Sequence, residues 1–100
     1  MGFFSWNCNG CNKSIRSQYS ISEDTEWMKR AVVIFPNGSR IIGEYDGYGR
    51  INDHDFYEAH GFNYETKFSM WHEKCWEESG HPEFTEPATN AEDQGYFIED

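Results

Sequence analysis

The three cysteines of this chain fall in two short motifs, Cys8-Asn9-Gly10-Cys11 and His72-Glu73-Lys74-Cys75. Each motif places two metal-ligating side chains three positions apart, a spacing typical of zinc sites in proteins. Gly10 suits the tight turn of a zinc knuckle, which directs two thiolates and several backbone N–H groups to one point. We therefore expect Cys8, Cys11, His72 and Cys75 to bind one structural Zn²⁺ per chain, with no open position for catalysis.

The composition is compatible with a small fold that depends on a metal. The chain has 100 residues, no leucine and 18% aromatic residues. One hundred residues suffice for one domain, and a domain poor in branched aliphatic residues often needs an added cross-link. Three cysteines cannot all pair with one another, and no stretch has the pattern of a signal peptide or a membrane span. We expect a single cytoplasmic domain over residues 1–100.

The net charge of −10 is concentrated in the second half of the chain. Residues 1–50 hold six Lys/Arg and five Asp/Glu, whereas residues 51–100 hold two and thirteen. An acidic surface repels phosphate and attracts basic protein surfaces, although acidity also keeps small proteins soluble. The charge predicts a protein partner with a basic surface and no direct contact with nucleic acid. The lack of a segment long enough to span a membrane predicts no membrane contact. Residues 81–100 are expected to form an acidic C-terminal segment.

Two runs rich in β-branched residues, 31–35 and 40–45, flank Asn37-Gly38. Asn-Gly is a strong hairpin signal, because a type I′ turn needs positive φ at both central residues. A two-residue turn of this kind also sets the register of the two strands. The opposed pairs expected in that register are Ile34 with Ile41 and Val33 with Ile42.

A second turn is expected at Asp46-Gly47, where residues 48–51 would return as a third strand. This pairing would place Ile51 beside Ile42 and complete an antiparallel β-meander. Phe62, Tyr64, Thr66 and Phe68 also alternate as in a strand, and the apolar residues 96–98 are expected to add an edge strand.

A short helix is expected over residues 70–79, with Ser69 as its N-cap. Gly80 and Pro82 supply the signals that end it. His72 and Cys75 would then share one face near the positive helix N-terminus, which favours a thiolate. With the meander, this helix predicts a zinc-stabilised α+β fold.

The order knuckle, hairpin, then helix with the last two ligands resembles treble-clef zinc domains, and residues 71–76 resemble the closing half-site of LIM modules. A broader resemblance covers most of the chain and relates it to small uncharacterised proteins of phages and bacteria. The segments that carry it are Met1–Trp6 with the first cysteine pair, Gly43–Arg50, His72–Trp76 and Asp93–Phe97. The resemblance implies a shared fold and no particular activity. For a phage-encoded protein, the compartment would be the host cytoplasm.

The function expected from these features is a protein–protein interaction module, such as a phage-encoded binder or inhibitor of a host protein. The candidate contact residues are Tyr45, Asp46, Tyr48 and Arg50, because tyrosine and arginine dominate interaction hot spots. The alternative is a plain hairpin turn whose tyrosines cover the sheet.

A metal-dependent nuclease of the HNH type is one alternative function. Asp53, His54, Asp55 and His60 form the only other concentration of titratable groups, and His54 would activate water there. The rest of the HNH signature is not recognisable, and the acidic half would repel DNA. We therefore expect no catalytic residues and no enzyme activity.

A zinc protein that binds nucleic acid without catalysis is the other alternative. Six basic residues lie in the first half, and Trp27, Tyr45 and Tyr48 could stack on bases. However, a nucleic-acid interface usually shows a basic excess, which residues 1–50 lack.

Overall fold

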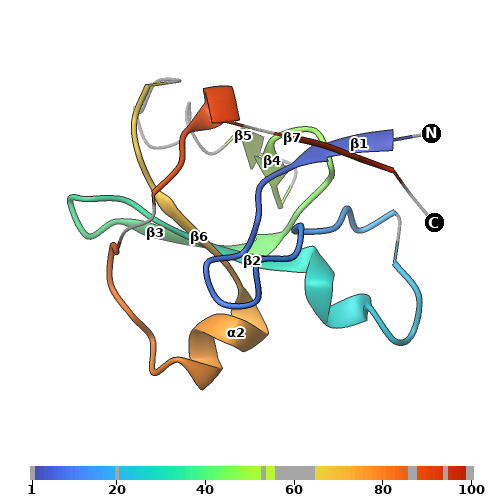
Figure 1. Ribbon diagram of the computed structural model, residues 1–100, viewed down its shortest axis with the longest axis horizontal. Helices are drawn as coiled ribbons and strands as arrows, with labels where there is room; N and C mark the ends of the chain where they lie inside the picture. The colour runs from blue at the N-terminus through green and yellow to red at the C-terminus, as the bar shows by residue number, and fades with distance from the viewer. Residues whose placement is uncertain are drawn as a thin grey trace.

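The computed structural model describes residues 2–19, 21–52, 54–55, 65–85, 88–93 and 95–98 (Figure 1). These residues form an α+β fold with an antiparallel three-stranded sheet in the order β3-β2-β6 and two smaller two-stranded sheets. The central sheet consists of β2 (Arg30–Ile34), β3 (Arg40–Glu44) and β6 (Ser69–His72). The smaller sheets pair β1 (Gly2–Ser5) with β7 (Gly95–Ile98), and β4 (Arg50–Ile51) with β5 (His54–Asp55). The helical elements are η1 (Glu26–Lys29), α2 (Glu73–Glu78) and η2 (Ala91–Asp93).

Strand β2 is the centre of the fold. Its residues from Ala31 to Ile34 are all buried, and so is Phe35 directly after them. A strand that is covered on both faces reads as a continuous apolar run rather than as an alternating one. This explains why the Ala-Val-Val-Ile sequence occupies the middle position of the sheet.

The hairpin between β2 and β3 forms where the sequence predicts it, but the predicted register is wrong by one residue. Val33 pairs with Ile41 and Val32 with Ile42. The loop is longer than a type I′ turn, because the Gly38 N–H donates to the Phe35 carbonyl at 3.0 Å and Gly38 has a φ of 92°. A type I turn followed by a left-handed glycine makes a three-residue loop, which shifts every opposed pair.

The predicted meander is also wrong, since the third strand of the central sheet is β6 rather than residues 48–51. The chain does turn back after Gly47, but Ile51 forms a bridge with Tyr45 instead of lying beside Ile42. Asn52 then occupies the edge of β3: its side chain accepts from the Glu44 N–H at 3.1 Å and donates to the Ile42 carbonyl at 3.3 Å. A side chain that pairs with the strand edge takes the place of another strand.

The helix begins later than predicted, at Glu73 rather than Met70. Residues 69–72 pair with β2 as a strand, so that His72 lies opposite Ala31 and Ser69 opposite Ile34. All four residues are buried, which matches a strand packed on both faces. The helix ends at Glu78, one residue before the expected end, and Gly80 follows the C-cap Ser79 with a φ of 84°, as expected of the residue that ends the helix.

The two ends of the described chain meet in one sheet, where Phe4 lies opposite Tyr96 and Ser5 opposite Gly95 (Figure 1). Residues 96–98 therefore form a strand as expected, but its partner is β1 and not the central sheet. Phe62 and Tyr64 lie outside the described residues, and Phe68 forms a bridge with Thr89. Within the part of the chain that the structure describes, no helix is both long and apolar enough to cross a membrane.

Candidate metal centre

The first ligand pair lies on a small hairpin that follows β1. Asn7 and Ser14 form its antiparallel bridge, and the Cys8 N–H donates to the Lys13 carbonyl at 2.9 Å. Inside this loop the Asn12 N–H donates back to the Cys8 carbonyl at 2.9 Å. The positive φ of the turn falls on Asn12, at 60°, rather than on Gly10. The loop thus holds Cys8 and Cys11 on one side of a tight turn, as the knuckle spacing predicts.

The second pair is positioned by the junction between β6 and α2. His72 is the last residue of the strand and the N-cap of the helix, and Cys75 lies in the first helical turn. Arg30 of β2 holds this junction through two hydrogen bonds to the Glu73 carboxylate, at 3.2 and 3.3 Å. The strand-to-helix change therefore aims both ligands back toward the knuckle.

The four ligand atoms converge, although the two motifs lie far apart in sequence. One ligand atom from each of Cys8, Cys11, His72 and Cys75 lies within 4.8 Å of all the others. The His72 Nδ1 is 3.3 Å from the Cys11 Sγ and 4.0 Å from the Cys75 Sγ. A tetrahedral zinc ion with Zn–S bonds of about 2.3 Å and a Zn–N bond of about 2.0 Å separates its ligand atoms by roughly 3.5–3.8 Å. The arrangement is compatible with one metal ion.

The orientation of the His72 ring suits ligation through Nδ1. Its Nε2 lies 3.0 Å from the carbonyl oxygen of Ser14, so Nε2–H donates and Nδ1 keeps its lone pair. A metal-ligating histidine usually donates its other N–H to a carbonyl in this way. Trp27 packs on the imidazole in an edge-to-face arrangement, with ring centroids 4.9 Å apart. His72 is fully buried, and these contacts hold the ring in place.

The electrostatics of the cluster favour a cation. Burial alone would raise the pKa of Cys8, but hydrogen bonds from His72 and from the Gly10 backbone lower it to about 6. The Cys8 Sγ accepts the Gly10 N–H at 3.2 Å and the His72 N–H at 3.1 Å. Burial and the neighbouring Cys8 raise the pKa of Cys75 to about 12, so the expected benefit of the helix N-terminus is outweighed. A divalent ion would remove this repulsion between the sulfur ligands.

Of the four residues predicted to contact a partner, two support the turn from within and two are exposed. Tyr45 is fully buried, and its hydroxyl donates to the Phe4 carbonyl and accepts the Gly49 N–H, so the structure places it in the core instead. Asp46 stabilises the turn, because its Oδ1 accepts the backbone N–H groups of Tyr48 and Arg50 at 2.7 and 3.0 Å. Tyr48 is 57% exposed and Arg50 is also exposed.

Two exposed aromatic residues that the sequence analysis missed adjoin this turn. Phe4 is 44% exposed, and its N–H donates to the Gly47 carbonyl at 2.9 Å. Tyr19 is 66% exposed; it follows Gln18, whose N–H donates to the Tyr45 carbonyl at 2.7 Å. The backbones of two segments distant in sequence thus adjoin the 45–50 turn, and each of the three segments carries an exposed aromatic residue. We call Phe4, Tyr19 and Tyr48 the aromatic region. The sequence gives no sign that these segments adjoin, because they are joined by backbone hydrogen bonds between residues remote in sequence.

The residues of the nuclease alternative are only partly described. His54 and Asp55 form β5, whereas Asp53 and His60 lie outside the described residues. The structure therefore assigns them no site.

Comparison of the chain with protein-family models, with curated proteins and with solved structures gives no match. The fold and the site thus define the protein only as far as a class: a small α+β protein whose Cys3His cluster is compatible with one metal ion.

Proposed function

We propose that this chain is a structural zinc protein that acts by binding a protein partner. The observation that carries the proposal is the convergence of three cysteine sulfurs and one imidazole nitrogen on a single point. Three thiolates and an imidazole form a typical ligand set for zinc. Bound there, zinc supplies a fixed cross-link between the knuckle and the β6–α2 junction.

A structural role for the ion is supported by the completeness of its ligand set. Catalytic zinc sites have three protein ligands and keep a position for water or substrate, whereas this cluster offers four. Cys8 and His72 are also buried, with exposed fractions of 1% and 0%. The ion in this proposal stabilises the fold and does not meet a substrate.

The arrangement around the ion is treble-clef-like in our proposal. Its support is the order of the elements: a knuckle, the β2–β3 hairpin, and a helix whose start carries the last two ligands. The helix is short and follows directly on β6, so His72 ligates from its N-cap rather than from its first turn.

The partner surface in this proposal is the aromatic region together with Arg50. Large exposed aromatic side chains next to an arginine are the residue types that dominate protein interfaces. The buried Tyr45 and the Asp46 side chain hold the turn in shape, so the surface is pre-organised and little entropy is lost on binding. The strongly acidic second half of the chain favours a partner with a basic surface.

Two measurements test the proposal. Metal analysis of purified protein should give one zinc per chain, and its absence would refute the structural role. Affinity capture from the natural host should then compare the wild type with Tyr48→Ala and with a control, Ile42→Ala, which removes an exposed apolar side chain of β3. A partner lost with Tyr48→Ala and kept with Ile42→Ala supports the aromatic region, whereas equal capture by all three proteins contradicts it.

A further inference from the structure

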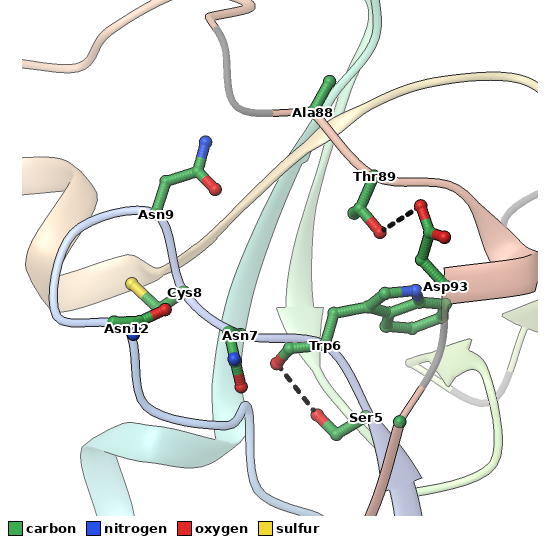
Figure 2. Close-up of a pocket in the computed structure, with 10 residues that line it drawn as sticks. Ser5, Trp6, Asn7, Cys8, Asn9, Asn12, Ala88, Thr89 and Asp93 are labelled. Atoms are coloured by element: carbon green, nitrogen blue, oxygen red, sulfur yellow. Dashed lines mark hydrogen bonds between the residues drawn. The ribbon is translucent and has the colours of Figure 1, made fainter.

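A hollow of about 410 Å³ lies between two segments distant in sequence, residues 5–12 on one side and residues 88–93 with Gly95 on the other (Figure 2). Its volume falls within the usual range of ligand sites. The side chain of Trp6 extends across it toward Asp93, and its walls carry Asn7, Asn9, Asn12 and Thr89. Most of these groups are polar and uncharged, so the hollow is suited to a ligand that makes hydrogen bonds.

Asn7 offers an unpaired stretch of strand edge in this hollow. Its bridge to Ser14 uses the neighbouring residues: the Ile15 N–H donates to the Trp6 carbonyl at 3.0 Å, and the Cys8 N–H donates to the Lys13 carbonyl at 2.9 Å. Backbone groups alternate in direction along a strand, so the N–H and C=O of Asn7 point away from Ser14. They have no hydrogen-bond partner within the described residues.

Along residues 5–9, as far as the structure describes their neighbours, the pairing on that second edge is interrupted at Asn7. Two positions before Asn7, Ser5 lies opposite Gly95. Two positions after Asn7, the Asn9 N–H donates to the Met70 carbonyl at 2.8 Å. Between these contacts the edge opens onto the hollow. An extended peptide could therefore pair with both backbone groups of Asn7, as in the addition of a strand to a sheet edge.

The negative charge of Asp93 in the hollow favours a peptide with a positively charged side chain. Asp93 is the only charged residue among the described residues that line it. Thr89 Oγ1 lies 3.2 Å from the Asp93 carboxylate and orients it, and the Lys67 Nζ is a weak and exposed neighbour at 3.9 Å. Because this ion pair is long and exposed it contributes little, and the Asp93 carboxylate still favours a positively charged ligand. The acidic second half of the chain adds to this preference.

We propose that this hollow binds an extended segment of the partner protein, with its backbone paired to Asn7 and a lysine or arginine side chain beside Asp93. This inference rests on the proposed function, which supplies a protein partner with a basic surface; it adds which segment of that partner is bound. The backbone pair supplies orientation, whereas the carboxylate supplies the preference for a cationic residue.

The test uses the full-length, zinc-loaded chain and a capped Gly-Lys-Gly tripeptide as the probe, observed by NMR of the backbone amides. Saturable shifts are expected at Asn7, Asn9 and Thr89, with slower hydrogen exchange at the Asn7 amide. Asp93→Asn should weaken binding about fivefold. The control Glu92→Gln removes the same charge from the neighbouring exposed residue of η2, which does not line the hollow, and should change binding far less.

A capped Gly-Glu-Gly tripeptide should not bind. The proposal is overturned if the lysine peptide produces no shifts, if its shifts lie away from Asn7 and Thr89, or if both variants weaken binding equally. These measurements need no natural partner, so they fail or succeed independently of the capture experiment with Tyr48→Ala. A chain that binds the peptide but whose partner does not depend on Tyr48 would refute the aromatic region alone.

Discussion

Gly10 of the knuckle lies so close to Cys75 of α2 that a methyl group added to Gly10 would come within 2.9 Å of the Cys75 Cβ. The same methyl group would lie 3.2 and 3.3 Å from two atoms of the Trp71 ring. Glycine is therefore needed at this position for space, because any larger residue would separate the two halves of the ligand set.

Gly10→Ala should destabilise the zinc-loaded protein by about 1–3 kcal/mol, since the added carbon overpacks the contact with Cys75 and Trp71. Chemical denaturation of the loaded protein measures the change. Gly95→Ala is the matched control, because the nearest atom to its new Cβ would be the Ser5 carbonyl oxygen at 3.8 Å, an ordinary contact. Equal stability of the two variants would contradict the close approach.

Removal of zinc by a strong chelator should unfold the chain, because a structural site of this kind contributes on the order of 10 kcal/mol to folding. Cys11→Ser and Cys75→Ser should each reproduce the loss, since each removes one of four ligands. Circular dichroism with metal analysis follows both effects. Glu77→Gln, an exposed substitution in the same helix, should keep the metal and the fold. Unchanged spectra in chelator would refute the metal dependence.

Zinc affinity should rise with pH between about pH 6 and pH 8. The pKa of Cys75 is raised to about 12, so this thiol is protonated over the whole interval and must release its proton when zinc binds. A falling pH opposes that release and weakens binding. Competition with a chromophoric chelator at several pH values measures the slope. An affinity independent of pH would mean that Cys75 is not a ligand.

Tyr45→Phe should cost about 1–2 kcal/mol, because the Phe4 carbonyl and the Gly49 N–H both lose their bond to the Tyr45 hydroxyl. Tyr48→Phe removes the hydroxyl of an exposed tyrosine in the same turn and should cost much less. Thermal unfolding of the two variants makes the comparison. A Tyr45→Phe protein as stable as the wild type would show that this hydroxyl does not join β1 to the turn.

The ligand set could be predicted because each half of it is local. Cys8 with Cys11, and His72 with Cys75, are recognisable from spacing alone, and the structure brings the pairs together. The local structure of His72 was not predictable in the same way. Its strand forms because the open edge of β2 accepts residues 69–72, and that partner is remote in sequence.

The hairpin shows a similar limit. Asn37-Gly38 correctly located the turn, but the register depended on whether Pro36 joined the loop, and a single residue in the loop shifts all the pairs. The aromatic region was only partly predictable for a related reason. Tyr48 stands in a recognisable turn, whereas Phe4 and Tyr19 reach it through hydrogen bonds between distant backbone segments.

The sequence separation of 64 positions from Cys8 to His72 gives the metal a further effect, which acts on the unfolded chain. An ion held at both motifs closes the intervening chain into a ring. A cross-link of that span lowers the chain entropy of the denatured state and so raises its free energy by about 4 kcal/mol at room temperature. Strand β3 contributes no ligand, yet it lies inside the ring with β2 and η1. Its stability should therefore follow zinc occupancy even though none of its own contacts changes.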